Sequence, residues 1–182
     1  MHPAVESVTQ LITPPSTPLL RDWRPVERQL TTELPGDYKQ LVHIYGGGVF
    51  NETIWLLDPY CPVEDYNLLS LTARRAEVLA GLWEVGEPVP VELAQKGARL
   101  IPWAYVEGSG AYLYWLAKPG QIPNDWSTML NEGRGPEWEH HPHSCAEFLI
   151  SAMTGALRSH CLPGLGGDRG RFDSNADILQ LW

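Results

Sequence analysis

Residues 34–50 read Leu34-Pro35-Gly36-Asp37-Tyr38-Lys39-Gln40-Leu41-Val42-His43-Ile44-Tyr45-Gly46-Gly47-Gly48-Val49-Phe50. After the Leu-Pro pair, the apolar residues recur at i, i+3, i+4 and i+7, which places them on one face of a helix: Tyr38, Leu41, Val42 and Tyr45. The glycine triplet 46–48 predicts the end of this helix, because glycine adopts the left-handed conformation at little steric cost. Val49 and Phe50 then begin strand-like sequence that continues at residues 54–57 and stops at Asp58-Pro59.

Three further helices are predicted on either side of this stretch. Asp22 is a favourable N-cap for a helix near residues 23–30, with Trp23, Val26 and Leu30 on one face. A second helix should cover about residues 68–83, with its arginines 74 and 75 facing away from its apolar side. The sequence Ser-Cys-Ala-Glu at 144–147 is a capping box that opens a third helix, whose apolar face extends to Leu157.

Two β-hairpins are predicted in the second half of the chain. Aromatic-rich runs at 100–106 and 112–116 flank the turn Gly108-Ser109-Gly110. A second hairpin should run from 127–131 to 137–140 through the glycines and proline of residues 133–136.

The ends of the chain differ in composition from its middle. Residues 1–20 contain Pro14, Pro15 and Pro18 and are predicted to form a flexible or extended lead-in. Residues 84–98 are predicted to be mostly loop, and residues 161–182 form a Gly-rich extension. The length of 182 residues suggests one domain, which we place at residues 21–160.

The composition excludes several classes of partner. The formal net charge is −9, which argues against nucleic acid or an anionic membrane, since both attract Lys and Arg. The chain contains three widely spaced cysteines, which predict free thiols in a reducing compartment. No leader pattern and no run of roughly 18 apolar residues are visible, so we expect a soluble cytoplasmic protein.

The chain contains eight tryptophans. Apolar patterning leaves three of them outside the predicted core, where a partner could contact them: Trp126, Trp138 and Trp182.

Candidate catalytic and metal-binding patterns are weak. Three histidines and a cysteine lie within His140-His141-Pro142-His143-Ser144-Cys145, a donor composition that zinc accepts. The spacing matches no common zinc motif, so an exposed strand-to-helix loop is the preferred interpretation. Cys145 beside a helix N-terminus is a weak candidate nucleophile without a placed base. We therefore predict no catalytic, cofactor-binding or metal-binding residues and no cofactor.

Residues 22–158 resemble the SUKH superfamily of Smi/Knr-type proteins, which includes bacterial immunity proteins and cell-wall regulators. The resemblance rests on Leu34-Pro35-x-Asp37-Tyr38-Lys39, on Tyr45-Gly46-x-Gly48-x-Phe50 and on Leu100-Ile101-Pro102-Trp103-Ala104. It implies a single α+β domain in which N-terminal, central and C-terminal helices pack around a mainly antiparallel sheet. It also implies structural roles for a signature set: Trp23, Leu34, Pro35, Tyr38, Tyr45, Gly46, Gly48, Phe50 and Trp103.

The function implied by the resemblance is non-enzymatic protein binding. The leading hypothesis is an immunity protein that occludes the active site of a cognate toxin domain of the nuclease or deaminase type. A chain of this charge would attract a basic partner, and the acidic loop residues expected to contact it are Glu64, Asp65, Glu84, Glu87 and Glu92. The alternatives are a regulatory scaffold for an endogenous protein or peptide and a metal-dependent enzyme built on His140–Cys145. The oligomeric state stays open.

Overall fold

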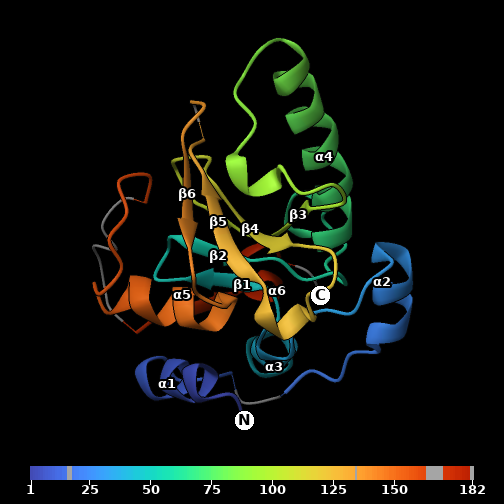
Figure 1. Ribbon diagram of the computed structural model, residues 1–182. Coiled ribbons are helices and arrows are strands. Elements are labelled where there is room, and N and C mark those ends of the chain that lie inside the picture. Colours follow the sequence, from blue (N-terminus) through green and yellow to red (C-terminus); the bar gives the residue numbers. More distant parts are fainter. Residues whose placement is uncertain (16–17, 134, 163–169, 181–182) are drawn as a thin grey trace.

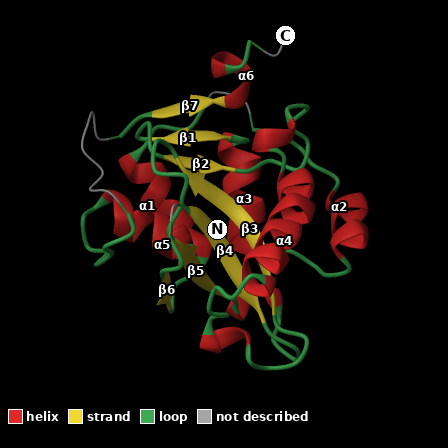
Figure 2. Cartoon of the chain, turned by 90° about the horizontal axis from the view of Figure 1, so that it is seen from above, coloured by secondary structure: helices red, strands yellow, loops and turns green. Residues whose placement is uncertain are grey.

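A seven-stranded antiparallel sheet with strand order β6-β5-β4-β3-β2-β1-β7 forms the centre of the protein (Figure 2). The computed structural model describes residues 1–15, 18–133, 135–162 and 170–180. The strands are β1 (Gly48–Phe50), β2 (Ile54–Leu56), β3 (Arg99–Val106), β4 (Tyr112–Ala117), β5 (Ser127–Asn131), β6 (Trp138–His141) and β7 (Phe172–Ser174). Both predicted hairpins are present, as β3–β4 and β5–β6.

Helices cover both faces of this sheet (Figure 1). The α-helices found among the described residues are α1 (Pro3–Leu11), α2 (Trp23–Leu30), α3 (Gly36–Tyr45), α4 (Leu68–Glu84), α5 (Cys145–Met153) and α6 (Asn175–Ile178). Helices α1, α3 and α5 contact one another on one side, while α4 packs against β3 on the other. The α+β fold with a mainly antiparallel sheet is therefore confirmed.

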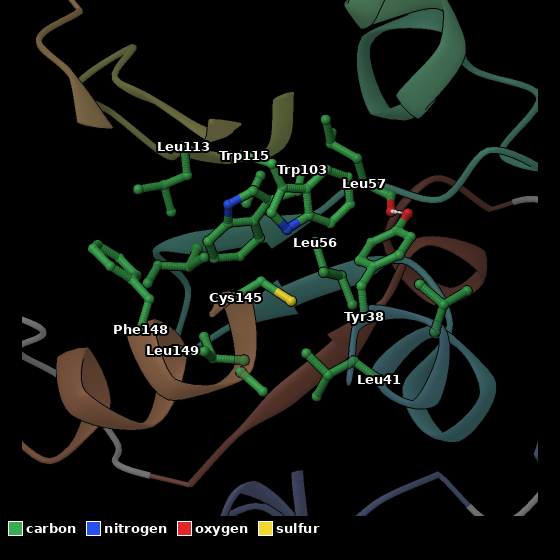
Figure 3. Close-up of a cluster of buried hydrophobic side chains, with 14 of the residues drawn as sticks. Tyr38, Leu41, Leu56, Leu57, Trp103, Leu113, Trp115, Cys145, Phe148 and Leu149 are labelled. Atoms are coloured by element: carbon green, nitrogen blue, oxygen red, sulfur yellow. Dashed lines mark hydrogen bonds between the residues drawn. The ribbon is translucent and has the colours of Figure 1, made fainter. Parts of the chain in front are cut away.

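The alternation of β4 explains why the sheet needs two helical layers. Leu113 and Trp115 point into the larger core beside Tyr38, Cys145 and Phe148 (Figure 3). The intervening residues Tyr114 and Leu116 form a smaller core on the opposite face with Leu79 of α4 and Met129 of β5. Because successive side chains of a strand point to opposite faces, one aromatic-rich strand supplies both cores.

The signature segment 34–50 has the local structure that its pattern predicts. Helix α3 ends at Tyr45, and the capping residue Gly46 has a φ of +73°, in the left-handed region. The hydroxyl of Tyr38 donates a hydrogen bond of 2.5 Å to the carbonyl oxygen of Leu57 in the core. A Cβ atom at Gly48 would lie 2.3 Å from the carbonyl oxygen of Asp173. Glycine is therefore required at Gly48 for β7 to pair with β1.

The N-terminal residues are not the flexible lead-in that the sequence predicts. Residues 3–11 form helix α1, and Val5, Val8 and Ile12 are fully buried. These three residues fall at i, i+3 and i+7, a helical pattern that the prolines nearby obscured. Pro3 starts the helix at the one position where proline fits well. Through its contacts with α5, α1 belongs to the domain, whose predicted start at residue 21 is wrong.

The described part of the C-terminal extension also contributes to the domain. Residues 172–174 pair with β1 and make β7 the edge strand of the sheet. Asn175 is the first residue of α6 and is buried. Its backbone amide donates a hydrogen bond to the carbonyl oxygen of Gly47. The predicted boundary at residue 160 is therefore not a domain boundary, and residues 163–169 and 181–182 of the extension lie outside the described residues.

Helix α5 starts where the capping box predicts and ends earlier than its apolar pattern suggests. The hydroxyl of Ser144 accepts from the amide of Glu147, and the Glu147 carboxylate accepts from the amide of Ser144. The helix ends at Met153, and Gly155 follows with a φ of +75°. Leu157 is therefore outside the helix, although it still packs against the main core.

Candidate partner-binding surface

Helix α4 and the loop that follows it project beyond the rest of the molecule at the top of Figure 1. The side chain of Asn67 caps the helix by accepting hydrogen bonds from the amides of Leu69 and Ser70. Leu71 and Leu79 anchor it through their buried side chains. The chain then turns at Gly86 and returns to β3 through residues 87–98, with one short 3₁₀ helix at Val91–Leu93.

Arg75 holds α4 to the sheet, which corrects the predicted outward orientation of this residue. Its guanidinium lies 4.4 Å from the centroid of the Tyr112 ring, and its Nε donates to the Tyr114 hydroxyl at 2.8 Å. Burial raises the pKa of Tyr114 to about 12, although Arg75 acts in the opposite direction. Three alanines of α4, Ala73, Ala76 and Ala80, are exposed instead. An arginine can bury the aliphatic part of its side chain over aromatic rings. The charge of Arg75 alone therefore led to the wrong prediction that this residue faces solvent.

An apolar groove lies between the second half of α4 and the loop. It has a volume of about 280 Å³ and is lined mainly by apolar side chains, including Leu79, Trp83, Val89 and Leu100, with Arg99 at its edge. Beside it, three valines of the same region are strongly exposed: Val85 at 82%, Val89 at 52% and Val91 at 79%. A cluster of exposed apolar side chains next to a groove is typical of a protein-binding site.

Three of the five predicted acidic contact residues lie at this projecting end. Glu84 is exposed beside Val85, and Glu87 is half-buried in the loop. Glu92 lies deeper, with its Oε1 4.0 Å from Nδ1 of His140 on β6. Burial lowers the pKa of His140 despite the opposing effect of Glu92, so the ring does not neutralise this carboxylate at neutral pH. We call Glu84, Val85, Glu87, Val89, Val91 and Glu92 the α4-loop surface.

The other two predicted residues are not part of this surface. Glu64 and Asp65 lie in a 3₁₀ helix before α4, at the opposite end of its 17 residues. At a rise of 1.5 Å per residue, this separates them from Glu84 by roughly 25 Å. Both pair with Arg74, at 3.7 Å from Glu64 and 2.6 Å from Asp65. The structure therefore places these two carboxylates apart from the α4-loop surface, and their contact with a partner stays a prediction.

The three tryptophans that the sequence analysis assigned to possible partner contacts differ in their exposure to solvent. Trp126 is 4% exposed and packs against Trp115 in the main core, so its assignment to a partner contact is wrong. Trp138 is half-buried, with its ring 5.5 Å from that of Tyr114. Trp182 lies outside the described residues.

The histidine-rich stretch 140–145 does not converge on one point. His140 contacts Ser127 at 2.8 Å, whereas His141 contacts Glu139 at 2.8 Å. Cys145 is fully buried at the start of α5, where burial and then the nearby Asp37 carboxylate raise its thiol pKa well above the usual range. A buried, protonated thiol is a poor nucleophile. The described residues whose ligand atoms do gather are Glu137, His160 and Cys161, a group that sequence spacing could not reveal.

The groove beside the second half of α4 has room for an apolar side chain, and Glu84 and Glu87 lie on the adjoining helix end and loop. In the described part of the chain, no helix combines the length and apolar character needed to cross a membrane. Comparison of the chain with protein-family models, with curated proteins and with solved structures finds no match in any of the three.

Proposed function

We propose that this protein is an immunity-type binding protein that neutralises a cognate toxin domain by covering its active site. The α4-loop surface is the observation that carries this proposal, because it has exposed valines and carboxylates on α4 and on the loop that projects with it from one end of the fold. The SUKH-like motif and the α+β fold agree with this function. The proposed place of action is the cytoplasm.

Charge supports a basic partner. The chain carries a formal net charge of −9, and Glu84 and Glu87 extend this charge onto the projecting end. Electrostatic steering of oppositely charged proteins raises association rates from about 10⁵–10⁶ to about 10⁸–10⁹ M⁻¹s⁻¹ at low salt. Toxins that act on nucleic acids are commonly basic for the same reason that nucleic acids attract Lys and Arg.

Apolar contact would supply the affinity that steering does not. A standard interface buries about 1,600 Å² in total, and its energy concentrates in a few desolvated anchors. The groove of about 280 Å³ between α4 and its loop has room for one large apolar side chain of the partner. Val89 lines this groove, and the exposed Val85 and Val91 of the same segment would add further apolar contact area.

Co-expression with a candidate toxin domain, taken from the gene next to the one that encodes this chain, tests the proposal. We expect the wild-type chain to restore growth. The variant Glu84→Lys/Glu87→Lys should lose protection, because it reverses two charges on the α4-loop surface. Val85→Asp, at a residue that is 82% exposed, should weaken binding without affecting folding.

The matched control is Glu6→Lys/Glu33→Lys, which makes the same charge change at exposed residues of α1 and of the segment before α3. This control should protect like the wild type. Toxin killing that the wild-type chain leaves unimpaired would contradict the proposal. An endogenous protein bound through the same surface in cells without a toxin gene would instead favour the regulatory scaffold.

A further inference from the structure

The segment after α5 returns across β6 and brings three metal-binding side chains together. Glu137 comes just before β6, and His160 and Cys161 lie in the returning segment. One ligand atom from each lies within 4.8 Å of the others. Nε2 of His160 lies 2.9 Å from Oε2 of Glu137. Nitrogen, thiolate sulfur and carboxylate oxygen are the three donor types that zinc accepts in proteins.

Glu139 fixes the returning segment in the required orientation. Its Oε1 lies 2.7 Å from Nδ1 of His160 and also accepts hydrogen bonds from the amides of His160 and Cys161, at 2.8 and 3.0 Å. Its other oxygen contacts Nε2 of His141 at 2.8 Å, and the side chain is only 9% exposed. A carboxylate that accepts the Nδ1 proton leaves Nε2 as the ligating atom of the imidazole, which is the common arrangement behind a metal-bound histidine.

A cavity adjoins the three ligand atoms. It has a volume of about 310 Å³ and is lined by Ser109, Glu132, Gly133, Glu137, His160 and Cys161. Three protein ligands leave one position of a tetrahedral zinc site for water or a further carboxylate. Glu132, in the turn between β5 and β6, lies in the same cavity and is the available carboxylate.

We propose that Glu137, His160 and Cys161 bind one zinc-class divalent transition-metal ion, with Glu139 as the positioning residue for His160. On binding, the metal forms bonds to Nε2 of His160, to a carboxylate oxygen of Glu137 and to Sγ of Cys161. The thiol proton of Cys161 and the Nε2 proton of His160 pass to solvent. The bound ion would fasten residues 158–162 to the β6 side of the sheet. This site is separate from the α4-loop surface and does not depend on the proposed toxin binding.

Titration of the metal-stripped full-length chain with ZnCl₂, followed by calorimetry and elemental analysis, tests the proposal. We expect one equivalent of zinc per chain. Substitution of a ligand, in Glu137→Gln, His160→Ala or Cys161→Ser, should weaken binding at least about tenfold. Glu139→Gln should weaken it about 10–100-fold while leaving all three ligands in place, as outer-shell substitutions do. Cobalt should give a thiolate charge-transfer band that Cys161→Ser abolishes.

Two variants serve as matched controls, because each removes the same type of donor elsewhere: Cys61→Ser at a buried thiol and Glu33→Gln at an exposed carboxylate. Both should bind zinc like the wild type. Binding that is not stoichiometric, or that survives the double substitution His160→Ala/Cys161→Ser, would overturn the site. The cobalt spectrum of the wild-type chain tests the role of Cys161 as a ligand even if a variant fails to fold. A spectrum without a thiolate band would rule out ligation by Cys161.

Discussion

The carboxylate of Asp37 accepts a hydrogen bond from the thiol of Cys145, with 3.3 Å between Oδ2 and Sγ, although the two residues are 108 positions apart. The same oxygen accepts from the amide of Ala146 at 3.0 Å. Asp37 thus satisfies a free amide at the start of α5 from its own place at the start of α3, where the helix dipole favours a negative charge. This contact joins the signature segment to α5 inside the core.

Replacing Asp37 should therefore destabilise the fold. Asp37→Ala leaves the buried amide of Ala146 and the thiol of Cys145 without this acceptor, and an unsatisfied buried donor costs about 1–3 kcal/mol. We expect the free energy of unfolding to fall by about 2 kcal/mol in urea denaturation. Asp125→Ala, at an exposed aspartate, should change it by less than about 0.5 kcal/mol. Equal effects of the two substitutions would contradict the role of Asp37.

The two neighbouring arginines of α4 should differ in their contribution to stability. Arg75→Ala removes the contact with the Tyr112 ring and leaves the hydroxyl of the buried Tyr114 unpaired, which should cost about 2 kcal/mol. Arg74→Ala removes only exposed ion pairs to Glu64 and Asp65 and should cost at most about 1 kcal/mol. Thermal unfolding of both variants checks the difference, and the reverse order would refute the orientation of α4.

Helix α1 should contribute measurably to stability. Val8 is fully buried where α1 packs on α5, and Val8→Ala removes about two methylene equivalents and leaves a cavity. At about 0.8 kcal/mol for each group plus the cavity term, the loss should be about 2 kcal/mol. Glu6→Ala, on the exposed side of the same helix, serves as the control. An unchanged denaturation midpoint for Val8→Ala would mean that residues 3–12 do not pack on the domain.

The carboxyl of Asp22 should titrate well below other aspartates. Hydrogen bonds from the side chain and the backbone amide of Arg24 lower its pKa from 3.8 to about 2. A depressed pKa stabilises the fold above the unfolded value of 3.8, and this contribution disappears as the pH falls through about 2. Arg24→Ala should move the midpoint, followed by carboxyl-carbon NMR, towards 3.8. Arg28→Ala should move it much less, since Arg28 acts only as a more weakly coupled charge.

The thiols of Cys61 and Cys145 should be protected in the folded protein. Both side chains are buried, and burial raises the pKa of each. In the Cys161→Ser background, an aromatic disulfide reagent at pH 8 should react with them at least about 10³-fold more slowly than in denaturant, because reaction requires unfolding. Rapid reaction of Cys145 under native conditions would contradict its burial and support its role as a nucleophile. Rapid reaction of Cys61 would show that this thiol is accessible to the reagent.

Local patterns in the sequence were sufficient for most of the secondary structure. The stripe of Tyr38 and Leu41 predicted α3, the glycine triplet predicted its end, and Ser144 predicted the start of α5. Two patterns failed for identifiable reasons. Prolines near residues 14–18 hid the short apolar stripe of α1, and the charge of Arg75 hid its packing on aromatic rings.

By itself, the sequence determined helices α2 to α5, the two hairpins and the acidic character of the chain, since these depend on neighbours within a few positions. Tertiary structure alone decided which acidic residues share a surface, because α4 separates Glu64 from Glu84 by its whole length. It also brought Glu137 to His160, which lie 23 positions apart on segments with no common period. Side chains that come together only through the tertiary fold have no regular spacing in the sequence. Helices and hairpins do have such a spacing, and it can be recognised from the sequence alone.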